Sequence, residues 1–243
     1  MFSVDWSVFD QPALLDDCSW LVYILKGLGW TLSLSASAFA LALAAGIVIG
    51  VLSTVKNHPL LHAFTSVWVE LFRNIPLIIQ IFLWFFVVPE FIPAMKAWMI
   101  ESDPVCGQFL AAFLCLGLFT SARIAEQIRS GIESLPAGQA NAARAIGFTE
   151  LQVYRFVLLP IALRLVLPPL TNEAMNLIKN TSIALTIGLA EVTMRAQEMG
   201  EATFQYFAAF ALATACYFVA TFAVNLIMRA VEQRTALVGF MTH

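Results

Sequence analysis

The sequence predicts an all-α integral membrane protein with five transmembrane helices, and two observations carry this prediction. Hydrophobic residues make up 60% of the 243 residues and charged residues only 12%, a balance unlike that of a soluble domain with a polar surface. Apolar runs long enough to cross a bilayer, which takes ~20 residues, recur along the chain. The formal net charge of −3 comes without a basic stripe, so we expect no nucleic-acid partner.

Five spans follow one another, separated by polar or acidic stretches. We expect them at about residues 22–54, 62–88, 105–128, 167–189 and 204–230. The acidic N-terminal stretch before them lacks the basic start of a signal peptide. In the first span, Gly46 and Gly50 keep a small-residue face for close helix packing. No linker or composition shift divides the chain, so we expect residues 1–243 to form a single transmembrane domain.

A polar-interrupted segment, residues 134–166, lies between the third and fourth spans and carries the signals of two short helices. Ser134 is the expected N-cap of the first helix, with Pro136 just inside it and Gly147 at a left-handed C-terminal turn. The residues from Thr149 to Gln152 fit a capping box that starts the second helix. We therefore expect helix, glycine turn and helix outside the membrane.

The first of these two helices has a slim face. Ala140, Ala143 and Ala145 leave little side chain on one surface, so the groove of a partner could approach the backbone closely. The sequence therefore predicts that this helix docks into another protein.

Ionisable residues inside the spans are candidates for function, because each costs about 2.5–3.5 kcal/mol to place at membrane depth. They are Arg73, Arg123, Glu173 and Lys179. Counted from the expected cytoplasmic ends of their spans, helix rise places Arg73 and Lys179 each roughly 16 Å in, close to the middle of a ~30 Å core. A structural salt bridge from Glu173 to Arg123 or Arg73 is the alternative interpretation of that carboxylate.

Two of the spans are also interrupted by polar residues or proline. Pro76, after Asn74 and Ile75, breaks the second span, and three polar residues follow Lys179 in the fourth. Such segments in two different helices point to a transport site, whereas two merely kinked packing helices are the alternative. The residues expected along the translocation path are Arg73, Asn74, Ile75, Pro76, Glu173, Lys179, Asn180, Thr181 and Ser182.

The 134–166 segment resembles the cytoplasmic EAA loop of ABC-importer permease subunits. That family carries Glu-Ala-Ala, three residues, Gly, nine residues, then Ile, any residue and Leu-Pro. This chain keeps every spacing, with Asn141 in place of Glu and Val157 in place of Ile. The resemblance assigns coupling to an ATPase to Asn141, Ala142, Ala143, Gly147, Leu159 and Pro160. Residues 72–77 and 172–182 are similar to the polar-amino-acid branch, and the resemblance extends from about Lys26 to Arg234.

The resemblance implies the type I ABC importer permease fold with a cytoplasmic coupling helix, and it implies several partners. The chain has no phosphate-binding loop, so we expect no catalytic residue, no metal site and no cofactor of its own. ATP and Mg²⁺ would be bound by two separate ATP-binding subunits. Five spans do not enclose a pore alone, so a second permease subunit, identical or homologous, is implied. An external solute-binding protein would deliver the substrate.

The distribution of lysine and arginine predicts the orientation in a bacterial inner membrane, in contact with lipid. If the 134–166 segment is cytoplasmic, the N-terminus lies outside and the C-terminus inside. The basic residues then inside are Lys56, Arg129, Arg144, Arg155, Arg164, Arg229 and Arg234, against Lys26, Lys96 and Arg195 outside.

The resemblance implies a polar L-amino acid as substrate, and the charges narrow the choice. Arg73 and Lys179 are both cationic, so a second carboxylate on the substrate would be favoured, and Glu173 could receive its ammonium group. We therefore expect glutamate or aspartate. Glutamine, histidine or a basic amino acid remain alternatives, as does a secondary transporter, which would have no reason to carry a capped helical pair on the cytoplasmic side.

Overall fold

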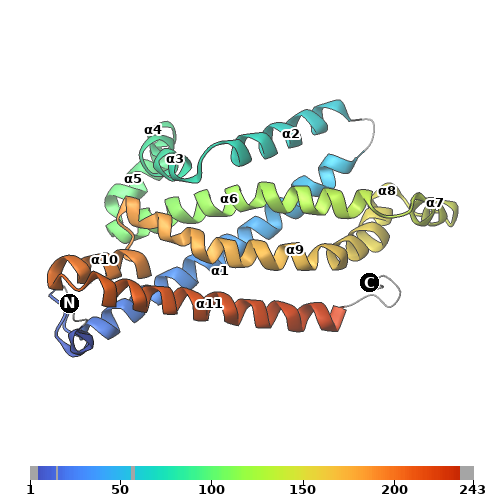
Figure 1. Cartoon of the computed structure of the whole chain (residues 1–243). Coiled ribbons are helices and arrows are strands. Elements are labelled where there is room, and N and C mark those ends of the chain that lie inside the picture. Colours follow the sequence, from blue (N-terminus) through green and yellow to red (C-terminus); the bar gives the residue numbers. More distant parts are fainter. Residues whose placement is uncertain (1–4, 15, 56–57, 236–243) are drawn as a thin grey trace. The chain divides into compact units, whose positions relative to one another are not determined.

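The computed structural model describes residues 5–14, 16–55 and 58–235, and within them it is helical without a β-strand (Figure 1). The α-helices are α1 (Trp20–Thr54), α2 (Pro59–Asn74), α3 (Leu77–Phe82), α4 (Val88–Phe91), α5 (Pro93–Glu101), α6 (Pro104–Glu133), α7 (Ala137–Ala145), α8 (Glu150–Val153), α9 (Leu159–Asn180), α10 (Val192–Thr203) and α11 (Tyr206–Thr235). Four shorter elements accompany them: the 3-10 helices η1 (Trp6–Asp10) and η4 (Thr181–Ile187), and the π-helices η2 (Leu83–Val87) and η3 (Tyr154–Leu158).

The expected all-α membrane fold is confirmed. Four stretches of the described chain are individually long and apolar enough to span a bilayer: α1, α6, the run Glu150–Ile187 and α11. The pair Pro59–Asn74 and Leu77–Phe91 forms a fifth span when its bent halves are counted together. The break lies where proline was expected to place it, because α2 ends at Asn74 and Ile75 is extended, with φ −87° and ψ 129°.

The described residues group into two compact units, each built from three separate stretches. The first unit contains the residues up to Ala38, then Pro76–Leu116 and Asn176–Ala223. The second contains Phe39–Ile75, Gly117–Met175 and the residues from Val224 onward. Each unit has its own hydrophobic cluster.

In the first unit, a buried carboxylate fixes the start of α10. Glu191 is fully buried, and its carboxylate accepts hydrogen bonds from the backbone N–H of Met194 at 3.0 Å and from the hydroxyl of Tyr217 at 2.5 Å. Burial raises the pKa of the Glu191 carboxyl, while the hydrogen bond from Tyr217 acts in the opposite direction. The N-cap bond and the bond from α11 together hold α10 against its neighbours.

The polar or acidic stretches between the second and third spans and between the fourth and fifth spans contain helices, α5 and α10. Three prolines and three acidic residues in residues 89–104 indicated breaks, yet α5 begins at Pro93, where proline fits the first turn. The second connection folds as α10 because Glu191 caps it and because Ala196 and Met199 are buried in the core of the first unit.

In the second unit, α1 packs against α6 at van der Waals contact, as the small-residue face predicted. A Cβ atom placed on Gly46 would lie 2.7 Å from Cβ of Ile124. One placed on Gly50 would lie 2.7 Å from the backbone oxygen of Ala125 and 2.7 Å from Cβ of Ile128. Only glycine lets the two helix backbones come this close.

The helical pair in residues 134–166 is present, and its glycine turn is confirmed. Gly147 has φ +94°, its N–H donates to Arg144 O, and the N–H of Phe148 donates to Ala143 O. These two bonds form a Schellman motif. The second start is also confirmed, since Thr149 and Gln152 make both hydrogen bonds of the capping box.

The start of α7 differs from the prediction. Pro136, not Ser134, is the N-cap residue, and the Ser134 hydroxyl donates to the carbonyl of Gly131 at 2.8 Å. A proline disfavours the helical conformation of the residue before it, so Leu135 cannot be the first helical residue as a Ser134 cap would require. Leu135 is instead buried in the core of the second unit.

The slim face of α7 is also oriented differently from the expectation. Ala140 and Ala143 are buried in the core of the second unit, and only Ala145 of the three predicted alanines is exposed. Small residues let α7 lie close to its own unit. The exposed residues of α7 are Ala137, Gly138, Asn141, Ala142, Arg144 and Ala145, and its C-cap residue Ile146 is exposed as well.

Candidate functional site

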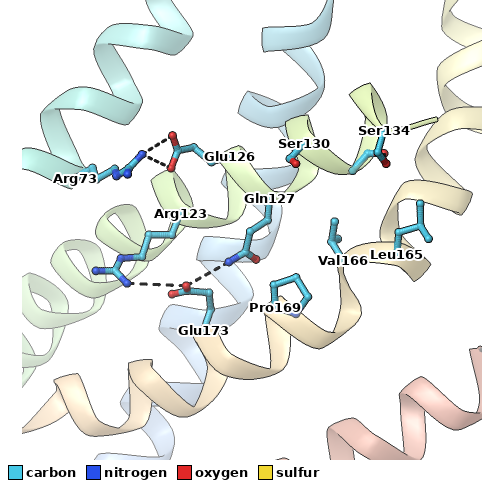
Figure 2. A pocket seen from close by; sticks show the side chains of 11 residues that line it. Arg73, Arg123, Glu126, Gln127, Ser130, Ser134, Leu165, Val166, Pro169 and Glu173 are labelled. Atoms are coloured by element: carbon cyan, nitrogen blue, oxygen red, sulfur yellow. Dashed lines mark hydrogen bonds and ion pairs between the residues drawn. The ribbon is translucent and has the colours of Figure 1, made fainter. Parts of the chain in front are cut away.

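The second unit contains a polar cavity of about 670 Å³ between the side chains of α2, α6 and α9 (Figure 2). Two arginines, two glutamates and a glutamine give it its chemistry. Its lining residues are Arg73, Arg123, Glu126, Gln127, Ser130, Gly131, Ser134, Leu165, Val166, Pro169 and Glu173. Two predicted path residues, Arg73 and Glu173, therefore line one cavity.

Arg73 approaches the cavity from the last turn of α2. Its Nη1 donates to both carboxylate oxygens of Glu126 on α6, at 2.5 Å each. The Arg73 side chain is nevertheless 54% exposed and that of Glu126 33%. Both hydrogen bonds come from one nitrogen, so the contact does not use the N–H groups of Nε and Nη2.

Glu173 is the more enclosed carboxylate, with 11% of its side chain exposed. Its Oε1 accepts a hydrogen bond from Nε2 of Gln127 at 3.2 Å and lies 3.9 Å from Nη1 of Arg123 (Figure 2). The guanidinium of Arg123 also stacks over the ring of Phe119, one turn earlier on α6, at 5.1 Å. The structural salt bridge considered for Glu173 is thus present with Arg123, whereas Arg73 pairs with Glu126.

A proline in α9 leaves one backbone carbonyl of that helix without its usual donor. Pro168 and Pro169 lie inside α9, and Pro169 has no N–H to donate to the carbonyl of Leu165 four residues earlier. The carbonyl of Leu165 therefore lacks the helical N–H that would normally donate to it. Leu165 and Pro169 both line the cavity.

A second cavity of about 540 Å³ lies on the other side of the same ion pair. Arg73 and Glu126 line both cavities, and Asn74 lines the second. The other residues around it include the acidic Glu70 and Glu133 and the basic Arg129. The Arg73–Glu126 pair therefore belongs to the boundary between two polar spaces of the second unit.

Of the other predicted path residues, Ile75 ends a stretch of the second unit, whereas Pro76 and residues 179–182 belong to the first unit. Lys179, near the end of α9, is exposed, and Thr181 is fully buried. The hydroxyl of Thr181 donates to Ile178 O at 2.7 Å, and that of Ser182 donates to Lys179 O at 2.8 Å. These hydroxyls bond to the backbone of their own helix, so they contribute to the change from α9 to η4. A cavity shared by Lys179 and Arg73 stays a prediction.

Glu126 and Gln127 are site residues that the sequence interpretation missed. They lie three and four residues after Arg123, so all three side chains share one face of α6. That spacing was a usable signal. Glu126 lies near the end of the expected third span, where a charge costs little and gives no sign of a functional role.

The exposed part of α7 carries a second charged contact. Nε and Nη2 of Arg144 donate to the two carboxylate oxygens of Glu150, at 2.6 and 3.1 Å. Nη1 of Arg144 donates to Oδ1 of Asn141 at 3.1 Å. Asn141 thus orients the arginine that ties α7 to α8 across the glycine turn. Leu159 and Pro160, the other end of the predicted coupling motif, are half-buried in the first turn of α9.

The fold and the site together are those of a membrane transport component. Its helices are long enough to span a bilayer, one span is broken, and a charged cavity is present, whereas a simple membrane anchor would need neither the break nor the cavity. Residues 46–237 match the family described as "Binding-protein-dependent transport system inner membrane component". The chain belongs to this family. Among the described residues, no group of histidine, cysteine, aspartate or glutamate side chains is arranged to hold a metal ion.

Three similar proteins set the comparison. The chain is 42% identical over 243 residues to the glutamate/aspartate import permease protein GltJ of Escherichia coli K12, with 98% of both chains covered. It is 33% identical to the probable glutamine ABC transporter permease protein GlnP of Bacillus subtilis, covering 88% of this chain and 94% of that one. A crystal structure of an amino acid ABC transporter with histidines has a TM-score of 0.72 and 28% identity, over 88% of this chain and 94% of that one.

Proposed function

We propose that this chain is the permease subunit of an ATP-driven importer for acidic L-amino acids, glutamate or aspartate. The observation that carries the proposal is the cavity of the second unit. It places two half-exposed guanidinium groups, Arg73 and Arg123, beside the carboxylate of Glu173. The similarity to GltJ favours the same substrates.

The cavity matches the charges of an acidic amino acid group by group. Carboxylates gain charge-assisted hydrogen bonds from guanidinium groups, so Arg73 and Arg123 would receive the substrate's two carboxylates. Glu173 and the carbonyl of Leu165 would accept from its ammonium group. A basic side chain would meet the two arginines at a cost of several kcal/mol. The predicted role of Lys179 adds a third cation.

The proposed partners are two ATP-binding subunits, a second permease and a solute-binding protein. Two ATP-binding subunits would contact the open surface of α7 around Asn141 and Ala142. A second permease, homologous or identical, would complete the pathway, and a solute-binding protein would deliver the amino acid. Closure of the ATP-binding subunits would move α7 and alternate the access of the cavity. The proposed orientation places the N-terminus outside and the C-terminus in the cytoplasm of a bacterial inner membrane.

The other substrates stay as defined alternatives. GlnP and the histidine-bound structure are similar to this chain, and glutamine or histidine would need fewer cationic partners. A secondary transporter would not need the Schellman turn and capping box that hold α7 and α8.

ATP-driven uptake of labelled amino acids into vesicles containing the complete transporter tests the substrate. We expect unlabelled aspartate to compete with labelled glutamate, and histidine, arginine and glutamine to compete weakly. Histidine or arginine outcompeting glutamate would refute the assignment. Glutamate uptake that is unchanged in Lys179→Ala would refute the role given to that lysine alone.

A further inference from the structure

We propose that Glu126 is a built-in competitor for the substrate, occupying Arg73 until a substrate carboxylate displaces it. This inference rests on the proposed function and adds a residue that sets affinity and selectivity. Glu126 is the nearest acidic partner recorded for Arg73, and both residues line the same cavity. Figure 2 shows the two side chains reaching toward each other from α2 and α6.

The geometry of the pair leaves Arg73 able to take a second carboxylate. The strongest arginine–carboxylate contact uses two nitrogens of the guanidinium fork in parallel. Here both bonds come from Nη1, so the Nε and Nη2 edge is not used by Glu126. The arginine side chain is also 54% exposed, so water or a ligand can reach that edge. An incoming carboxylate can bind there first and take Nη1 afterwards.

Exposure makes the exchange energetically feasible. Ion pairs in contact with water contribute little, because both ions are well solvated when they separate. Glu126 has 33% of its side chain exposed and lines the second cavity too, so its carboxylate can move into a polar space when it leaves Arg73. Glu173 differs, because it is enclosed and accepts from Gln127. The displaceable carboxylate is therefore Glu126.

The inference has a consequence for selectivity. A neutral ligand group offers Arg73 no charge to replace that of Glu126, so the pair stays closed. An anionic group replaces one carboxylate by another at little loss. Glu126 thus lowers the affinity of every ligand that displaces it from Arg73 by the same factor, and only a ligand whose own contact with Arg73 is strong, an anionic one, still binds there.

The experiment is equilibrium binding of labelled glutamate to the purified complete transporter, without ATP and without the solute-binding protein. Removing the competitor in Glu126→Gln should tighten glutamate binding about two- to fivefold, the size expected for losing a solvated ion pair. Glu126→Asp keeps the charge, so its dissociation constant for glutamate should stay close to that of the wild type and should not show the gain expected of Glu126→Gln. In an Arg73→Gln background, the Glu126→Gln change should give no gain.

Glu90→Gln is the matched control, since Glu90 forms an exposed ion pair with Lys96 at 2.6 Å and lines neither cavity. It should leave the dissociation constant unchanged. Unchanged or weaker glutamate binding in Glu126→Gln, with wild-type melting temperature, would overturn the inference alone. A wild-type transporter that binds histidine or arginine but not glutamate would instead refute the proposed function.

Discussion

Gly147 holds a backbone angle φ of +94°, which residues with a Cβ atom rarely adopt. A Cβ placed there would have no atom within 4 Å, so space is not what requires glycine. The requirement is conformational: the N–H groups of Gly147 and Phe148 close the C-terminus of α7 only in this turn. The angle between α7 and α8 therefore depends on one residue.

Replacing Gly147 with valine should strain this turn by about 1 kcal/mol or more. Because α7 is the proposed contact with the ATPase, ATP hydrolysis should continue while uptake falls. The ratio of amino acid imported to ATP hydrolysed in vesicles measures this coupling.

Gly138→Ala is the control for the Gly147 change, since Gly138 lies within α7, the helix that the Gly147 turn closes, without a positive φ and with open space at Cβ. Normal coupling is expected there. Normal coupling in Gly147→Val as well would count against the proposed role of the turn.

Helices α1 and α6 pack closely in the second unit. Gly46 and Gly50 lie one turn apart on α1, and both bring its backbone against residues of α6 from Ser121 to Ile128. Helix packing in a membrane depends on such close contacts, because lipid offers apolar side chains no gain from burial. The position of α6, which carries Arg123, Glu126 and Gln127, thus depends on these glycines.

Gly50→Val should push α1 away from α6, because its side chain would overlap the Ala125 carbonyl and Ile128. Overpacking of this kind costs about 1–3 kcal/mol, so the melting temperature of the detergent-purified protein should fall. Gly29 is the control on the same helix, as a Cβ there meets nothing within 4 Å. A fall in Gly29→Ala as large as that in Gly50→Val would mean that the contact is not the cause.

Elements with a strong local signal were predictable, and those that depend on burial were not. The spans, the break at Pro76, the Gly147 turn and the Thr149 capping box each follow from residue chemistry within a few positions. Helix α10 was not predicted, because acidic residues are typical of a solvated loop. In the structure Glu191 is buried and accepts a hydrogen bond from Tyr217 of α11, a contact that the local sequence does not indicate. The prediction that Ala143 lies on a docking surface was wrong for the same reason, because composition does not say which side of α7 packs against the core.

At the scale of the whole molecule, the sequence predicted some residues of the site but not how they pair. Arg73 and Glu173 stood out because charges inside apolar spans are rare. Glu126 did not stand out, and the pairing of each residue depends on which helices face each other in the second unit. Spacing alone left Glu173 with two possible arginines, and the distances decide for Arg123.

The account's central claim is that the cavity around Arg123 and Glu173 carries an acidic amino acid. The most direct test is ATP-driven uptake of labelled glutamate and of glutamine by vesicles holding wild-type, Arg123→Gln or Lys96→Gln transporter, at saturating binding protein. Lys96 pairs with Glu90, is not among the residues that line the cavity, and is the matched loss of a cation. The account predicts that Arg123→Gln lowers glutamate uptake about tenfold, the loss of one charge-assisted hydrogen bond, and lowers glutamine uptake much less. Equal glutamate uptake in all three transporters would contradict it.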